Sequence, residues 1–288
     1  MNECLTIAIG EILICIHCHH PVEERLRQSR YRDFVAEGRP DIVLDMHDGL
    51  PKLKYTDKIF ECPPIWSLHQ QGKVTAVEVY RDPTFPESAA KVCTFSYPLK
   101  RADLYVSKDA PAWSGIITGP TMELLIISYL AQGKGLIVHG CGIDFSGNGL
   151  LFVGDSGAGK STLAKLWNRY SNSDCILSDD RIIVRYVDDD FWIHGTPWHG
   201  DATFASPQKT QLKKVFFLQH GDANSFSDVS KLRAVSDLTK SSFLPHWDPG
   251  GMTFSLSVLE ELVNTIPCQQ LMFRPDKNAV DFIQGGVG

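Results

Sequence analysis

The stretch Gly154-Asp155-Ser156-Gly157-Ala158-Gly159-Lys160-Ser161-Thr162 decides the fold expected for this chain of 288 residues. It matches the pattern G-x-x-x-x-G-K-[ST], a loop that binds the phosphates of a nucleoside triphosphate. Glycines in such a loop let several backbone N–H groups turn toward one anion. Lys160 would reach the β- and γ-phosphates, and the Ser161 hydroxyl would bind Mg²⁺. The motif therefore predicts that the chain binds ATP and Mg²⁺ through residues 154–162.

The segments on both sides of the loop fit this prediction. Residues 149–153 form a short apolar run that indicates a buried strand. After the loop, Leu163, Leu166 and Trp167 have the spacing of one helix face. The order strand, loop, helix is the context in which the motif has its meaning, and the helix would add its positive N-terminal dipole to the anion site.

Composition excludes several classes of protein. Hydrophobic residues make up 43% of the chain, enough for a core, and the net charge is −6. A negative chain does not favour sequence-independent nucleic-acid binding, so no nucleic-acid partner is expected. No run of 18 apolar residues occurs, and the N-terminus, with Glu3 and Glu11, lacks the features of a signal peptide. We expect a cytoplasmic protein with no membrane contact, and the sequence leaves a homo-oligomer open.

The eight cysteines are scattered along the chain, several of them inside apolar runs. This pattern predicts reduced, buried thiols. The stretch Cys15-Ile16-His17-Cys18-His19-His20 has two interpretations. It could bind zinc, or it could be the end of a strand entering a polar loop, since alternate residues of a strand face opposite ways and would not converge on one ion.

Residues 1–118 are predicted to form a smaller, β-rich N-terminal domain. The strand candidates are residues 5–16, 41–46, 74–80 and 104–106. Only residues 22–37 have a helical pattern there, and they are highly charged.

Residues 119–288 are predicted to form the phosphate-loop domain. Gly119-Pro120-Thr121 opens an apolar helix that ends at Gly133. It is apolar nearly all round, so burial is expected. Residues 146–149 indicate a hairpin turn. The remaining strand candidates are residues 136–139, 175–177, 181–187, 191–194 and 215–219.

Acidic residues follow a strand beyond the loop, in Leu177-Ser178-Asp179-Asp180-Arg181. In phosphate-loop proteins one carboxylate at such a position holds Mg²⁺, directly or through water. A second can accept the proton of an attacking hydroxyl. The alternative is a solvated Asp-Asp turn.

Two further residues have candidate roles. His139, at the end of a predicted strand, could position a carboxylate or carry a charge, or it could be structural. Asp201, in the turn at residues 195–201, could be a third metal ligand, or part of an ordinary loop.

Four motifs, in their order and spacing, resemble HPr kinase/phosphorylase, namely His139-Gly140, Gly147-x-Gly149, the loop at 154–161 and the acidic segment at 178–181. The resemblance covers about residues 120–200. It extends to a broader HPr-kinase-related group that includes kinases of precursor peptides. It implies an α/β fold, with a C-terminal phosphate-loop kinase domain of the HPr-kinase/phosphoenolpyruvate-carboxykinase type.

The resemblance also implies roles for individual residues. Lys160 and Ser161 would be ligands of ATP and Mg²⁺. Asp179 and Asp180 would be the metal-side carboxylate and the base, with Asp180 favoured as the base. His139 would lie beside this pair, and Asp201 on the metal side. Residues 201–214 lack the glutamate-arginine-glycine-rich signature of HPr kinase, so neither HPr as the substrate nor the reverse reaction is implied.

These observations together predict an ATP-dependent kinase whose acceptor is a hydroxyl, most simply a serine of a peptide or protein. A small-molecule acceptor is an alternative. A second alternative is a regulatory module that binds ATP without transferring phosphate.

Overall fold

The computed structural model describes residues 3–18, 20–51, 57–80, 89–108, 120–171 and 176–287. The chain divides into two compact units, Met1–Gln132 with Pro245–Pro249, and Gly133–Leu244 with Gly250–Gly288. The domain boundary expected from the sequence, between residues 118 and 119, lies outside the described residues. Helix α3 (Thr121–Leu130), which follows it, belongs to the first unit.

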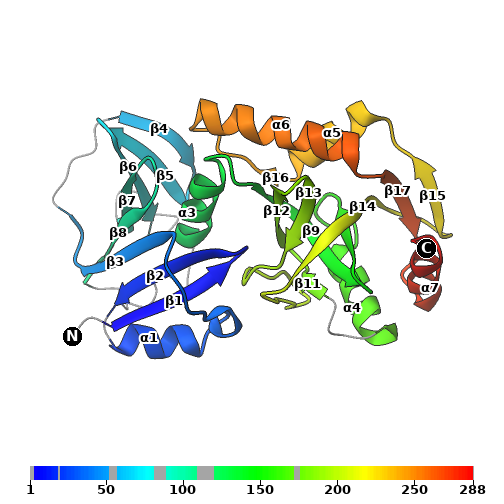
Figure 1. Cartoon of the computed structure of the whole chain (residues 1–288), viewed down its shortest axis with the longest axis horizontal. Coiled ribbons are helices and arrows are strands. Elements are labelled where there is room, and N and C mark those ends of the chain that lie inside the picture. The colour runs from blue at the N-terminus through cyan, green and yellow to red at the C-terminus, as the bar shows by residue number, and fades with distance from the viewer. Residues whose placement is uncertain are drawn as a thin grey trace. The chain divides into compact units, whose positions relative to one another are not determined.

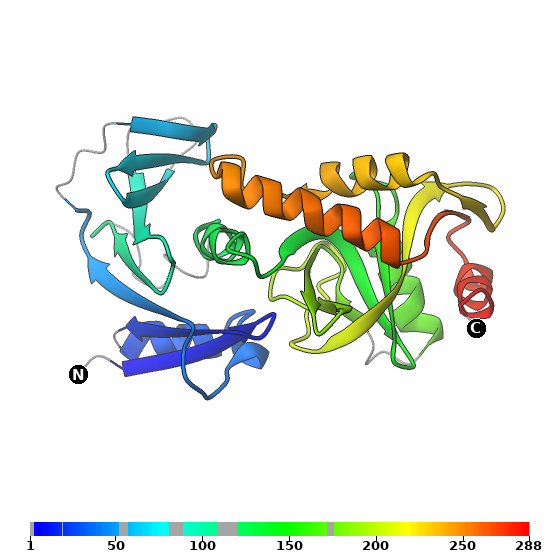
Figure 2. The same ribbon diagram turned by 45° about the horizontal axis from the view of Figure 1, so that its top comes forward.

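The first unit contains a mixed sheet in which eight strands are described, in the order β1-β2-β3-β8-β7-β6-β5-β4. The strands are β1 (Glu3–Ile9), β2 (Ile12–Cys18), β3 (Ile42–Asp48), β4 (Asp57–Cys62), β5 (Trp66–Gln71), β6 (Val74–Tyr80), β7 (Ala89–Ser96) and β8 (Arg101–Val106). Two shorter helical elements accompany α3, namely α1 (His20–Arg27) and the 3-10 helix η1 (Arg32–Phe34). Helix α1 lies along the β1–β2 hairpin in both views (Figures 1 and 2).

The β1–β2 hairpin changes the prediction made for two cysteines. The alternating residues 5–16 form two strands joined at Gly10 and Glu11, both with positive φ. The hairpin brings Cys4 diagonally opposite Cys15, with Cα atoms 6.0 Å apart, and the two form a disulfide. The prediction of reduced thiols is therefore wrong for this pair.

The second unit is built on a sheet in which nine strands are described. These are β9 (Leu136–Phe145), β10 (Asn148–Val153), β11 (Ile176–Ser178), β12 (Arg181–Val187), β13 (Asp190–His194), β14 (Lys209–His220), β15 (Ser225–Asp228), β16 (Ser242–Phe243) and β17 (Cys268–Phe273). The main order is β10-β9-β12-β13-β14-β17-β15, and β14 also pairs with β10, so five strands close a ring. The helices are α4 (Lys160–Tyr170), α5 (Lys231–Lys240), α6 (Pro249–Thr265) and α7 (Lys277–Gly285).

The fold class predicted from the sequence, an α/β phosphate-loop kinase domain after a smaller β-rich domain, is wrong. Of the described residues, 43% lie in strands and 26% in helices, and both sheets are large and mixed. Two-residue turns explain the difference. Ser146-Gly147 and Asp188-Asp189 have φ angles from 53° to 84°, which suit tight connections between antiparallel strands. The chain therefore returns through the hairpins β9–β10 and β12–β13, where an α/β fold would use crossover helices.

Alternating side chains of the second sheet supply two cores. Leu151 and Val153 of β10 pack on one face with α5 and α6, whereas Leu150 and Phe152 pack on the other with α4 and α7. Figure 1 shows α5 and α6 on one side of these strands and α4 on the other. In both views α5 and α6 lie side by side (Figures 1 and 2). Burial of β10 on both faces fixes the strand that leads into the phosphate loop.

Several predicted elements are confirmed. The apolar helix is α3, and nine of its ten residues are buried. The strands predicted at 74–80 and 181–187 match β6 and β12, and the turn at 146–149 joins β9 to β10. Gly119 and Cys175 lie outside the described residues. Within the described part of the chain, no helix is long and apolar enough to cross a membrane.

A substitution of Gly149 tests whether β10 and β14 have to lie as close together as they do in the structure. A Cβ atom there would come within 2.5 Å of the Gln211 carbonyl oxygen and 2.8 Å of Thr210 Cγ2. We expect Gly149→Ala to lower the free energy of unfolding by about 1–3 kcal/mol, since a backbone atom cannot move aside cheaply. Urea denaturation measures this.

Gly285 provides the matched control. It lies at the end of α7, and a Cβ atom there would meet nothing within 4 Å. Gly285→Ala should be neutral, or stabilising by less than about 1 kcal/mol. Equal effects of the two substitutions would contradict the close approach of β10 to β14.

Candidate active site

The phosphate-loop motif has the strand, loop and helix that its sequence predicts. β10 ends at Val153 and α4 begins at Lys160. Gly157 and Gly159 have φ angles of 84° and 102°, a region that costs other residues roughly 1–2 kcal/mol. A Cβ atom on Gly159 would also come within 2.7 Å of the Phe273 ring. The two glycines therefore allow the loop to close tightly before α4.

Lys160 holds its charge inside this loop. The residue is 6% exposed, and Nζ donates to the carbonyl oxygens of Gly154 at 2.6 Å and Asp155 at 3.0 Å. Burial lowers the pKa of Lys160, and the Asp155 carboxylate acts in the opposite direction. Gly159 occupies the N-cap position of α4, so no side chain caps the first N–H groups of the helix. The first N–H groups of α4 and the Lys160 ammonium thus form one region of positive potential.

Asp179 is 1% exposed and accepts four hydrogen bonds. Oδ2 accepts from the Ser161 hydroxyl at 3.1 Å and from the backbone N–H of Ala202 at 2.9 Å. Oδ1 accepts from the N–H groups of Gly200 at 3.1 Å and Phe204 at 3.2 Å. A carboxylate offers about four lone-pair positions. These four donors therefore use the acceptor capacity of Asp179.

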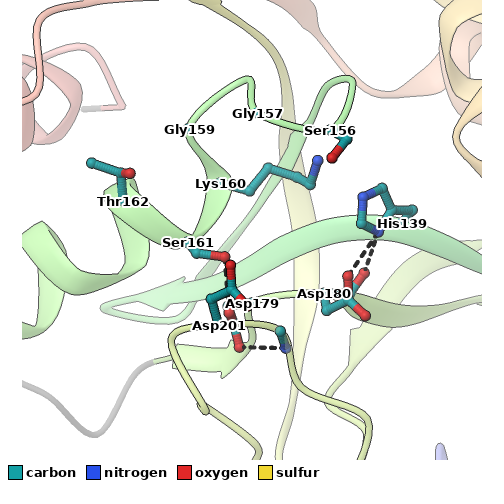
Figure 3. Close-up of a pocket in the computed structure, with 11 residues that line it drawn as sticks. His139, Ser156, Gly157, Gly159, Lys160, Ser161, Thr162, Asp179, Asp180 and Asp201 are labelled. Carbon is teal, nitrogen blue, oxygen red and sulfur yellow. Dashed lines mark hydrogen bonds and ion pairs between the residues drawn. The ribbon is translucent and has the colours of Figure 1, made fainter.

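Asp180 is the next residue but has different partners. Its Oδ1 lies 2.9 Å from Nδ1 of His139, and the dashed lines in Figure 3 mark the contacts between these two residues. Its Oδ2 accepts from the guanidinium of Arg181. Arg181 is paired with His139 across β12 and β9, which brings His139 beside Asp180, 41 residues later in the chain. The guanidinium also lies over the Phe243 ring, 5.0 Å from its centroid.

His139 is uncharged at neutral pH. Burial, and after it the positive charges of Lys160 and Arg181, lowers the pKa of its imidazole from 6.5 to about 4. Asp180 lies within ion-pair distance of His139, which by itself would raise the histidine pKa. Arg181 neutralises the same carboxylate, so this effect is smaller than that of burial. A neutral imidazole that carries its proton on Nδ1 donates it to the backbone carbonyl oxygen of Asp180, 3.1 Å away, while the carboxylate Oδ1 lies beside the same nitrogen.

Asp201 lies in the segment that wraps around Asp179. Its neighbours Gly200 and Ala202 donate to the buried carboxylate, while Asp201 itself is exposed. Thr203 has a φ angle of 61°, which is strained for a β-branched residue. The strain is maintained by the surrounding hydrogen bonds, which hold Asp201 at the edge of the site.

A cleft of about 270 Å³ brings most of the predicted residues together (Figure 3). It is lined by His139, Ser156, Gly157, Gly159, Lys160, Ser161, Thr162, Asp179, Asp180, Gly200 and Asp201. Ligand pockets usually measure roughly 300–1,000 Å³, so this cleft suits a polyphosphate more than a whole nucleotide. Gly154 and Asp155 line a neighbouring cleft instead.

His220 is a functional candidate that the sequence did not indicate. Its Nε2 donates to the carbonyl oxygen of Gly157 at 2.6 Å, and its ring stacks on Phe273 with centroids 6.2 Å apart. His220 ends β14, which runs parallel to β10. The carboxyl ends of adjacent parallel strands meet at one edge, so the pairing of β10 with β14 was the missing information.

The chain matches no protein-family model, and no curated protein matches it. The resemblance to HPr-kinase-related proteins therefore depends on the motif residues alone.

The two aspartates should differ in what they contribute to stability. Asp179→Asn turns an amide NH₂ toward backbone N–H donors, so we expect a loss of roughly 2–4 kcal/mol in the free energy of unfolding. Asp180→Asn should cost less, because that side chain is 17% exposed and water can replace a lost partner. Chemical denaturation of both variants measures the difference. Equal losses would contradict the central position of Asp179.

The His139 pKa gives a pH prediction. In the unfolded chain this histidine would titrate near 6.5, but in the folded chain near 4. As the pH falls from about 6.5 to about 4, His139 binds a proton in the unfolded state but stays neutral in the folded state. The free energy of unfolding therefore decreases over this pH range. An NMR titration should show no change at the His139 ring between pH 8 and pH 5, and a midpoint near 6.5 would contradict the geometry.

Proposed function

We propose that this chain is an ATP-dependent kinase that transfers a phosphoryl group to a hydroxyl, most simply a serine of a peptide or protein. The observation that supports it is the convergence of three parts in one cleft. They are the glycine loop with Lys160, the Ser161–Asp179 hydrogen bond, and the His139–Asp180 pair. Phosphoryl transfer depends mainly on positioning and charge neutralisation, which such parts supply.

The hydrogen bonds of the two aspartates suggest different roles. Asp179 has its acceptor positions used by Ser161 and backbone N–H groups. The Asp180 carboxylate accepts from Arg181 on Oδ2, and its Oδ1 lies 2.9 Å from His139 Nδ1, which donates to the Asp180 backbone carbonyl, so each carboxylate oxygen retains a lone pair. We therefore assign proton acceptance from the substrate hydroxyl to Asp180 and a positioning role to Asp179.

The residues around Lys160 fit the phosphates of a nucleotide and a magnesium ion. The buried ammonium and the uncapped start of α4 favour phosphates. The Ser161 hydroxyl donates a hydrogen bond to Asp179, which leaves the Oγ lone pairs available to a cation. Exposed Asp201 adds a carboxylate oxygen, a hard ligand of the kind that Mg²⁺ prefers. Bound Mg²⁺ would neutralise charge on the transferred group. Asp179 would act on the metal through Ser161.

His139 and Arg181 would tune the base. The guanidinium of Arg181 donates to the Asp180 carboxylate, and the neutral imidazole donates to the Asp180 backbone carbonyl with Nδ1 2.9 Å from Oδ1. Both partners fix the direction of the carboxylate, and the guanidinium charge favours its ionised form. A weak base of this kind suffices, because the transition state of phosphoryl transfer needs little help in removing the proton.

A second cleft supports an acceptor larger than a small alcohol. It measures about 390 Å³ and shares Gly154 and Asp155 with the phosphate loop. Its wall includes Ser241, whose carbonyl oxygen accepts from the His139 backbone N–H at 2.6 Å. The other polar groups of its lining are Gln219, Arg233, Asp237, Lys240 and Gln270. Amides and charges of both signs suit a peptide. The motif resemblance to HPr-kinase-related enzymes points the same way.

We further propose that the protein works in the cytoplasm. A kinase needs a compartment with ATP. Five of the described cysteines, Cys18, Cys62, Cys93, Cys141 and Cys268, form no disulfide, as is usual in a reducing compartment, whereas Cys4 and Cys15 are joined.

The experiment is incubation of the full chain with Mg²⁺ and γ-labelled ATP, against serine peptides, whole proteins and small alcohols. We expect stable label on a hydroxyl acceptor. Lys160→Ala should lower the transfer rate by about 10²–10³-fold, since it removes a charge beside the reacting phosphate. Asp180→Asn should lower it by about 10²–10⁴-fold while ATP binding persists.

Lys165→Ala is the matched control, because Lys165 is an exposed lysine on the same helix. It should leave both binding and transfer unchanged. ATP binding without labelled acceptor would favour the regulatory module, and transfer to alcohols alone would favour a small-molecule kinase. An unchanged transfer rate in the Asp180→Asn variant would mean that another residue accepts the proton of the substrate hydroxyl.

A further inference from the structure

Three side chains that commonly bind metals meet on one face of the β1–β2 hairpin. Cys4 lies directly opposite His17, and Cys15 precedes His17 by two positions on β2. Side chains two apart on a strand, and those directly opposite across a ladder, share a face. The two Sγ atoms and a ring nitrogen of His17 all lie within 4.8 Å of one another.

The histidine of this group is held by a carboxylate. Nδ1 of His17 lies 2.8 Å from Oδ1 of Asp45, which occupies the paired position on β3. The other Asp45 oxygen lies 2.7 Å from Nε of Arg101. A metal-binding histidine usually has such a carboxylate on its second nitrogen, which fixes the ring and raises its basicity. Nε2 of His17 is then the nitrogen for a metal.

We propose that Cys4, Cys15 and His17 form a redox-gated site for one thiophilic divalent cation of the Zn²⁺ class. With the disulfide present, the sulfurs carry no negative charge and bind metals poorly. A dithiol reductant would pass two electrons and two protons to the Cys4–Cys15 bond and become a disulfide itself. Metal binding to the two thiols would then release their two protons.

The dimensions suit this ion. Zinc binds thiolate at about 2.3 Å and imidazole at about 2.0–2.1 Å. Ligand atoms in a tetrahedral site are therefore about 3.5–3.8 Å apart, which lies within the 4.8 Å limit on the distances among these three groups, and reduction frees the two sulfurs to separate. Cys4 is exposed, and the His17 side chain is 36% exposed. A fourth position would be open to water.

The site differs from the one suggested by Cys15-x-x-Cys18 in the sequence. Cys18 lies three positions beyond Cys15, on the opposite, buried face of β2. It cannot reach the same ion without breaking the strand. Cys4, from the neighbouring strand, takes its place.

The test is a cobalt titration of the reduced, metal-depleted full chain, without nucleotide. Co²⁺ serves as the probe because thiolate ligands give an intense charge-transfer band in the near ultraviolet. We expect saturation at one equivalent, displacement by Zn²⁺, and no band in the oxidised chain. Asp45→Asn should weaken affinity about 10–100-fold, as loss of such a carboxylate does elsewhere.

His47 provides a matched control. It lies on the same sheet, 2.7 Å from the Asp103 carboxylate, with similar exposure, but it is not part of the cysteine group. His47→Ala should keep the band, whereas Cys4→Ser and His17→Ala should each lose it while circular dichroism shows a folded chain. Absence of a band in the reduced chain, or its survival in either ligand variant, would overturn the proposal. Neither result bears on the kinase assay.

Discussion

The buried carboxylate of Asp179 is the interaction on which the cleft depends. It connects the start of α4, through Ser161, to the segment that contains Gly200, Ala202 and Phe204. A buried carboxylate with fewer partners would be costly, so all four donors have to remain in place together. The strained backbone that follows Asp201 is tolerated for the same reason. One side chain thus determines where the loop, the helix and the metal-side residues lie.

The charged side chains of the cleft determine the protonation state of His139. Lys160 is positive and buried inside the loop, and Arg181 is positive beside Asp180. Both cations, with burial, keep His139 neutral. A neutral His139 donates to Asp180 and adds no positive charge to the cleft. The cleft therefore combines a cationic loop for phosphates with an ionised carboxylate that still has acceptor capacity.

The sequence predicted local elements well and the fold class badly. The glycine loop, its strand and its helix follow from the local sequence of residues 148–170, and the apolar helix α3 follows from its own residues. The class depends on which strands pair. Ser146-Gly147 and Asp188-Asp189 turn the chain back on itself, and only the first of these turns contains a glycine. The sequence did not show which strands pair. The fold was therefore predicted from the resemblance to a known kinase family, and the chain does not have that fold.

In both sites, the spacing of residues along the sequence identifies only some of the residues that come together in the fold. The acidic pair was visible in the sequence, but its link to His139 depends on the pairing of β12 with β9. Likewise Cys15 was visible in a C-x-x-C pattern, yet Cys4 and His17 are its companions because β1 pairs with β2 in one register. A shift of either register by one residue would turn these side chains to the opposite face. The chemistry proposed for each site is therefore a consequence of strand register, which the buried apolar faces of the two sheets enforce.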